Sequence, residues 1–165
     1  MAVSGRAIDR LVSIAIYAGF GCLSLWAGIA LINHSLGARL YKDFLLGWEV
    51  AAVTYTEQGG VWPPFSGGNH VEYMEQVTRL FCSRGLSLPE SNTGRPYLYR
   101  FDKIGAPEED IFLLCFSQRI ILYGLSSNTF TLLDSYIDGK DDPEEGRFQG
   151  RLSRDGISYT GVWQL

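Results

Sequence analysis

The chain has 165 residues, of which 46% are hydrophobic and 19% are charged, and its formal net charge is −4. These averages hide an uneven distribution, because no Asp, Glu, Lys or Arg occurs in the 28 residues from Leu11 to Ala38. The length suits one domain. The single uncharged run excludes a purely soluble globule, an extended disordered chain and a transporter with several spans.

The uncharged run predicts a membrane-spanning helix over residues 11–33. As an α-helix this segment would be about 34 Å long, enough to cross a hydrocarbon core of about 30 Å. A secretory signal peptide is the alternative, but its apolar core has only about 7–15 residues, which is shorter than this run. We therefore expect a single-pass membrane protein.

Basic side chains flank the predicted span equally, with Arg6 and Arg10 before it and Arg39 and Lys42 after it. The positive-inside rule therefore gives a tie. Insertion that leaves the ten-residue tail inside and moves the 132-residue domain across the membrane is the simpler arrangement. It makes residues 1–10 a short cytoplasmic tail and places residues 34–165 on the other side of the membrane.

Residues 34–165 form the predicted head domain. Only two basic residues and Asp9 precede them, so their net charge is −5. Binding of nucleic acid requires clustered Lys and Arg, which this part of the chain lacks. We expect no nucleic-acid partner.

The predicted helix continues beyond the uncharged run. Apolar side chains recur three or four residues apart at Leu40, Phe44, Trp48, Ala51 and Tyr55, and no proline occurs before Pro63. This spacing indicates an amphipathic helix. We expect one helix that starts in the membrane and ends at about residue 57, before the pair of glycines at 59 and 60.

The remaining pattern predicts a second helix from about residue 69 to residue 85 and six strands. The strands are expected at residues 97–101, 111–116, 120–125, 129–137, 148–152 and 157–163. Their short connections favour an antiparallel meander, and the apolar residues on both faces of the second and third strands indicate cover on both sides. The expected fold class is α+β, with the long helix packed on an antiparallel β-meander.

This order of elements resembles that of the type IV pilins and the type II secretion pseudopilins. The resemblance rests on the apolar N-terminal helix, the aromatic-rich segment from Tyr55 to Trp62-Pro63, and the acidic loop Asp138–Gly146. It implies an inner-membrane protein whose head lies in the periplasm and contacts other proteins, including copies of itself, in a secretion or pilus-type system. A membrane-tethered periplasmic binding module that forms no filaments is the alternative.

The N-terminal processing motif of that family is only partly present. Gly5 stands where the family has its cleavage-site glycine, so processing there would give a chain that begins at Arg6. The family has an aromatic residue next and a Glu at the fifth mature position. Here Arg6 and Arg10 occupy those positions, and Asp9 lies one position early. An uncleaved pilin-like protein fits these residues as well as a filament subunit does.

The acidic loop is the candidate metal site. Asp138, Asp141, Asp142 and Glu144 could supply oxygen ligands to a calcium ion. The resemblance points the same way, because some pseudopilins hold calcium in a C-terminal loop. The spacing does not match the standard D-x-[DN]-x-[DN]-G loop, however, and a solvated acidic turn is the alternative.

Two further features are candidates for structure or binding. Cys82 and Cys115 are the only cysteines outside the span, and they could form a disulfide in an oxidising periplasm or remain separate buried thiols. Trp62 and Phe65 flank two prolines and could form an interaction surface or pack the loop onto the head. The sequence shows no nucleophile–base pair and no other metal motif, so we expect neither an enzyme nor a further cofactor.

Overall fold

The computed structural model describes residues 5–139, 144–154 and 156–165. Asp141 and Asp142, two of the residues predicted to bind calcium, lie outside these ranges. The contacts divide the chain into two compact units, Met1–Ser35 and Leu36–Leu165. The second unit is called the head domain below.

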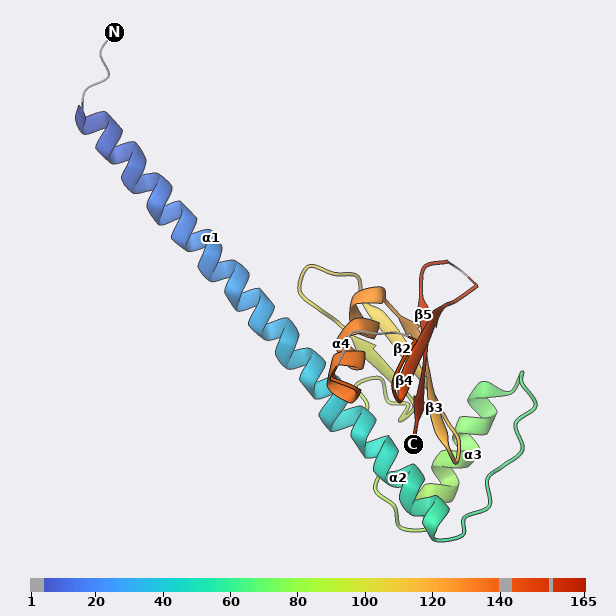
Figure 1. Ribbon diagram of the computed structural model, residues 1–165. Coiled ribbons are helices and arrows are strands. Elements are labelled where there is room, and N and C mark those ends of the chain that lie inside the picture. Colours follow the sequence, from blue (N-terminus) through green and yellow to red (C-terminus); the bar gives the residue numbers. More distant parts are fainter. Residues whose placement is uncertain (1–4, 140–143, 155) are drawn as a thin grey trace. The chain divides into compact units, whose positions relative to one another are not determined.

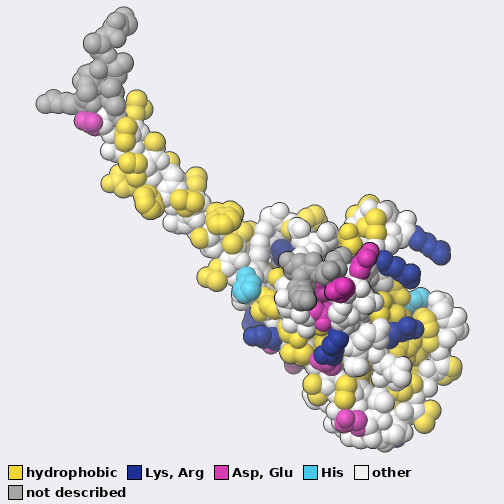
Figure 2. Space-filling model, viewed as in Figure 1, with side chains coloured by type: hydrophobic (Ala, Val, Ile, Leu, Met, Phe, Trp, Pro, Cys, Tyr) yellow, Lys and Arg dark blue, Asp and Glu magenta, His cyan; other side chains and the backbone are white. Residues whose placement is uncertain are grey.

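The first unit consists of most of helix α1 (Gly5–Arg39). Large apolar side chains such as Tyr17, Leu25 and Trp26 are exposed along it, and Figure 2 shows apolar atoms over this helix. One N-terminal helix is thus long and apolar enough to span a membrane or to serve as a signal sequence.

The helix continues into the head domain without a non-helical break. After α1 come a π-helical segment, η1 (Leu40–Leu45), and helix α2 (Leu46–Glu57), so the helical run from Asp9 to Glu57 has 49 residues. In η1 the Leu46 N–H bonds to the Tyr41 carbonyl, five residues back. Leu40, Phe44 and Leu45 are all buried in this wider turn. The end predicted at about residue 57 is confirmed.

Helix α3 (His70–Ser83) confirms the second predicted helix. Its inward face consists of Tyr73, Met74, Val77 and Phe81, which follow helical spacing. The preceding residue, Asn69, does not cap the helix with its side chain; its Oδ1 accepts a hydrogen bond from the Ser66 N–H instead.

Five strands form one antiparallel sheet in the order β1-β2-β3-β5-β4. They are β1 (Leu98–Phe101), β2 (Glu109–Cys115), β3 (Arg119–Leu125), β4 (Phe148–Leu152) and β5 (Tyr159–Gln164). The α+β class is confirmed, and the first three strands are paired in chain order as a meander requires. The full meander is wrong, because β5 pairs with β3 and leaves β4 at the edge (Figure 1).

The meander prediction failed because residues 129–137 are helical. Helix α4 (Ser127–Ile137) replaces the predicted strand. Ser126 begins it as an N-cap whose side chain accepts a hydrogen bond from the Thr129 N–H, while Phe130 and Leu133 face the core at helical spacing. Cap and spacing override the β-propensity of the aromatic and β-branched residues in this segment.

The two faces of the sheet are covered to different extents. Residues 40–55 of the long helix pack on one face, where Phe44 contacts Tyr99 with ring centroids 4.9 Å apart. Helix α3 lies against β2, where the Tyr73 hydroxyl donates a 3.0 Å hydrogen bond to the Cys115 carbonyl. Strand β3 keeps Ile121 and Tyr123 only half-buried. The predicted two-sided cover is therefore complete only at Leu113, Leu114 and Cys115 of β2 and is partial for β3.

Two valines test the assignment of the core. Val77 is fully buried on α3, whereas Val50 is exposed on α2. We expect Val77→Ala to lower the free energy of unfolding by about 2 kcal/mol through lost burial and the cavity left behind. The matched change Val50→Ala should leave it within about 0.5 kcal/mol of the parent. Thermal or denaturant unfolding in detergent measures both, and equal effects would contradict the core described here.

Candidate functional site

The acidic loop uses its first carboxylate for structure. Asp138 Oδ1 accepts a 2.9 Å hydrogen bond from the Arg147 N–H, and Oδ2 accepts one of 2.7 Å from the Phe148 N–H. Asp138 therefore joins the end of α4 to the start of β4. Within the described ranges no group of three or more metal-binding side chains occurs, and Glu144 is exposed. Calcium binding by Asp138, Glu144 and the two residues outside these ranges stays a prediction.

The two head-domain cysteines are free thiols in this structure. Cys115 is buried in β2, as predicted, and its N–H donates to the Met74 sulfur. Cys82 is exposed, because it lies one position beyond Phe81 and so off the buried face of α3. The prediction that both cysteines lie on buried faces is wrong for Cys82, and the structure has no Cys82–Cys115 bond.

Trp62 and Phe65 are half-buried and pack the loop between α2 and α3 onto the head. Trp62 makes edge contacts with Tyr55 and Phe81, at centroid distances of 5.4 and 5.6 Å, and its Nε1–H donates to the Thr56 hydroxyl. Phe65 contacts three aromatic rings at 5.2–5.3 Å. These rings belong to His70, Tyr73 and Phe116. The loop-packing interpretation of this cluster accounts for these contacts, and a role in binding stays a prediction.

Gly5 is the first residue of α1. This position does not test cleavage between Gly5 and Arg6, which stays a prediction from the sequence.

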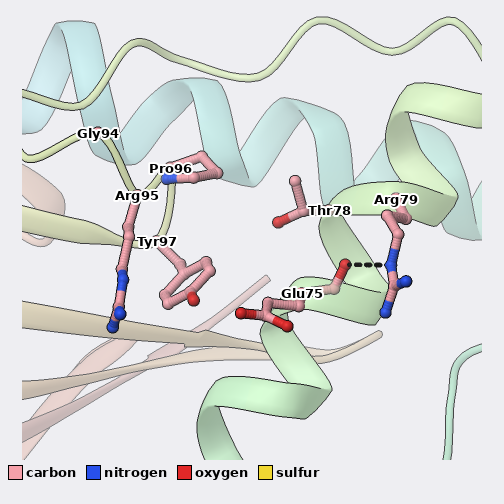
Figure 3. Close-up of a pocket in the computed structure, with 7 residues that line it drawn as sticks. All are labelled: Glu75, Thr78, Arg79, Gly94, Arg95, Pro96 and Tyr97. Atoms are coloured by element: carbon pink, nitrogen blue, oxygen red, sulfur yellow. Dashed lines mark hydrogen bonds between the residues drawn. The ribbon is translucent and has the colours of Figure 1, made fainter.

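A groove of about 390 Å³ separates α3 from the segment that leads into β1. It is lined by Glu75, Thr78, Arg79, Gly94, Arg95, Pro96 and Tyr97. Figure 3 shows the Glu75 carboxylate between the side chains of Arg95 and Arg79. The groove thus presents two cations and one anion to a ligand. Its residues come from two segments that no sequence motif links.

The polar atoms of this groove are only partly used within the protein. The Arg79 Nε–H donates to the Glu75 carbonyl at 3.3 Å, which fixes the guanidinium beside the helix (Figure 3). Burial raises the pKa of Tyr97, and the neighbouring Glu75 carboxylate adds to the rise. The buried Thr78 hydroxyl has no hydrogen-bond partner among the described residues.

A second polar cluster, centred on Glu109, is structural. The Glu109 carboxylate lies 3.1 Å from Lys103 Nζ, and the two side chains are only 9% and 11% exposed. It also accepts hydrogen bonds from the Ser126 N–H and from the hydroxyls of Ser126 and Thr129, at 2.8–2.9 Å. The carboxylate therefore lies at the N-terminus of α4, where negative charge is favourable. This cluster ties the start of β2 to that helix.

Thiol labelling tests the cysteine assignment. In the folded protein, a maleimide should modify Cys82 and leave Cys115 unmodified, because Cys115 is buried and burial raises the pKa of its thiol. Peptide mass mapping after labelling without a reductant measures both sites. Recovery of a linked Cys82–Cys115 peptide would instead establish the disulfide.

A double-mutant cycle tests the Glu109 cluster. Glu109→Gln should lower the free energy of unfolding by about 3 kcal/mol, because it leaves the buried Lys103 ammonium without its counter-charge. Adding Lys103→Met should recover part of this loss. Glu108→Gln is the matched control, since its pairing with Arg100 is half-exposed and is expected to contribute about 1 kcal/mol or less. Equal losses at positions 108 and 109 would contradict the role given to Glu109.

Comparisons with protein-family models, curated proteins and solved structures find no match for this chain. The architecture itself is pilin-like, since a long apolar N-terminal helix precedes an antiparallel sheet.

Proposed function

We propose that this protein is a membrane-anchored, pilin-like structural component of a secretion or pilus-type assembly. The observation that carries the proposal is the continuous helix from Asp9 to Glu57. Its first half exposes apolar side chains, and its second half belongs to the core of the head domain. Such a helix can hold the protein in lipid and present a folded domain outside it.

In this proposal residues 1–10 lie in the cytoplasm, the helix crosses the inner membrane once, and the head lies in the periplasm. Its partners are other membrane or periplasmic proteins, including further copies of the chain. Ala15, Gly19 and Gly28 would allow close approach of neighbouring helices within the bilayer. The role is structural rather than catalytic.

A membrane-tethered binding module is the second candidate, and the groove beside α3 favours it. The groove offers the Glu75 carboxylate and the guanidinium groups of Arg79 and Arg95 to a ligand that carries both charges. A binding module of this kind needs the same anchor but no association between copies. Self-association in the membrane therefore separates the two candidates.

Cys22 provides a native probe for both anchoring and assembly, because it lies at the centre of residues 11–33 and is exposed on α1. In intact membranes whose periplasmic face is accessible, we expect a charged maleimide to modify Cys82. We expect it not to modify Cys22. Oxidation in the bilayer should then link Cys22 of neighbouring copies into dimers. Gel mobility and peptide mass mapping measure both results.

Cys22→Ser is the control and should abolish the dimer, whereas Cys82→Ser should retain it. Rapid modification of Cys22 in intact membranes would contradict the anchor. Protection of Cys22 without any dimer would contradict the assembly component and leave the tethered binding module.

A further inference from the structure

We infer that two parts of the head domain rest on the surface of the lipid bilayer: the loop of residues 102–108, and the described residues 153–154 and 156–158 of the loop between β4 and β5. This inference depends on the anchoring proposed above and extends it, because it identifies the part of the head that meets lipid. The apolar side chains of Ile104, Leu152 and Ile157 are exposed on or beside these loops, Ile157 to 83%. Two exposed cations lie near them, Arg151 on β4 and Arg154 on the second loop.

The two loops lie at the same end of the sheet. One joins β1 to β2 and the other joins β4 to β5. Because all neighbouring strands are antiparallel, the end of β1 and the end of β4 are on the same side as the end of β3 (Figure 1). The turn between β2 and β3 is at the opposite end.

Helix α4 shows which end of the head this is. At its C-terminal end, Tyr136 stacks on Tyr41 with centroids 5.5 Å apart. Leu132, one turn nearer the N-terminus of α4, lies against Gly37. α4 therefore runs in the same direction as the helical segment that enters the head, and its N-terminus lies at the end where that segment begins.

The same helix also fixes the direction of β4. The C-cap residue of α4, Asp138, binds the N–H of Phe148 at the start of the strand. Phe130, in the first turns of α4, packs against Gly150 further along it. β4 therefore runs toward the N-terminus of α4, and its last residue, Leu152, lies at the end of the head that contains Leu36.

Chain length then places this end of the head near the bilayer. Leu36 is three residues beyond Asn33, where the predicted span ends. Three residues extend at most about 11 Å, and about 4.5 Å when they are helical as here. The headgroup layer on each side of the hydrocarbon core is itself about 5–7 Å thick. Leu36 therefore lies in or next to the headgroup layer, whatever the tilt of the helix.

The side chains at this end suit that environment. Burial of isoleucine and leucine side chains at the boundary of the acyl chains is favourable in free energy. Arginine binds headgroup phosphates through its planar guanidinium. The first loop also contains an uncharged turn from Ile104 to Pro107.

Spin labels in the full-length protein test this contact. Cysteines are introduced singly at Ile104, Ile157 and Val61 in a Cys22→Ser/Cys82→Ser background, and the protein is reconstituted in vesicles of phosphatidylethanolamine and phosphatidylglycerol. Val61 is the matched control, because it is 80% exposed but follows the far end of α2. Native Cys22, labelled in a Cys82→Ser variant, serves as the reference for bilayer depth.

The measured quantity is the ratio of collisions with oxygen, which concentrates in lipid, to collisions with a water-soluble nickel chelate. On transfer from detergent to vesicles, we expect this ratio to rise several-fold at positions 104 and 157 and to stay unchanged at position 61. A water-like ratio at 104 and 157 with a lipid-like ratio at Cys22 would overturn the inference and leave the anchor intact. A water-like ratio at Cys22 would overturn the anchor and the inference together. A lipid-like ratio at all three head positions would also overturn the inference.

Discussion

The packing of residues 40–55 against the sheet is the constraint on which the head domain depends. Leu45, Trp48 and Ala52 are fully buried there, and Trp48 also donates a 3.0 Å hydrogen bond to the Pro96 carbonyl. Burial of a large apolar side chain stabilises a fold by about 1.5–3 kcal/mol, so this helix cannot detach without loss of the core. Because the same helix includes the uncharged run, no non-helical linker separates that run from the head.

The elements that could be predicted from the sequence are those whose signal is local. The spacing from Leu40 to Tyr55 predicted a helix, and Gly59, which has a φ of 68°, marks its end as the glycine signal indicated. The strands around residues 111–125 were also predicted within two residues, because the short connection between them favours a hairpin. α4 is not among the predicted elements, because residues 126–128, which include its cap, fit one of the short connections between the predicted strands. The β-rich composition of residues 129–137 then favoured a strand.

The candidate sites could be predicted less well, because they depend on contacts between distant segments. The alternative of two separate buried thiols fails at Cys82, because this residue follows the buried Phe81 on α3. One residue along a helix is a rotation of about 100°, which carries Cys82 into solvent. The groove joins Glu75 and Arg95, which are far apart in the sequence. Glu109 had no motif either, since its partners Lys103 and Thr129 meet it only when the sheet and α4 have formed.

α4 also determines which positions of the sheet must be glycine. A Cβ atom at Gly150 would overlap the Phe130 ring, and one at Gly161 would overlap Phe148. The two glycines are directly opposite each other on β4 and β5, so together they form the hollow that admits these stacked rings. This close approach holds α4 between the edge of the sheet and the entering helix. The packing of Phe130 over Gly150 thus fixes the direction of β4 relative to that helix. It also fixes the end of the sheet at which Ile104 and Ile157 lie.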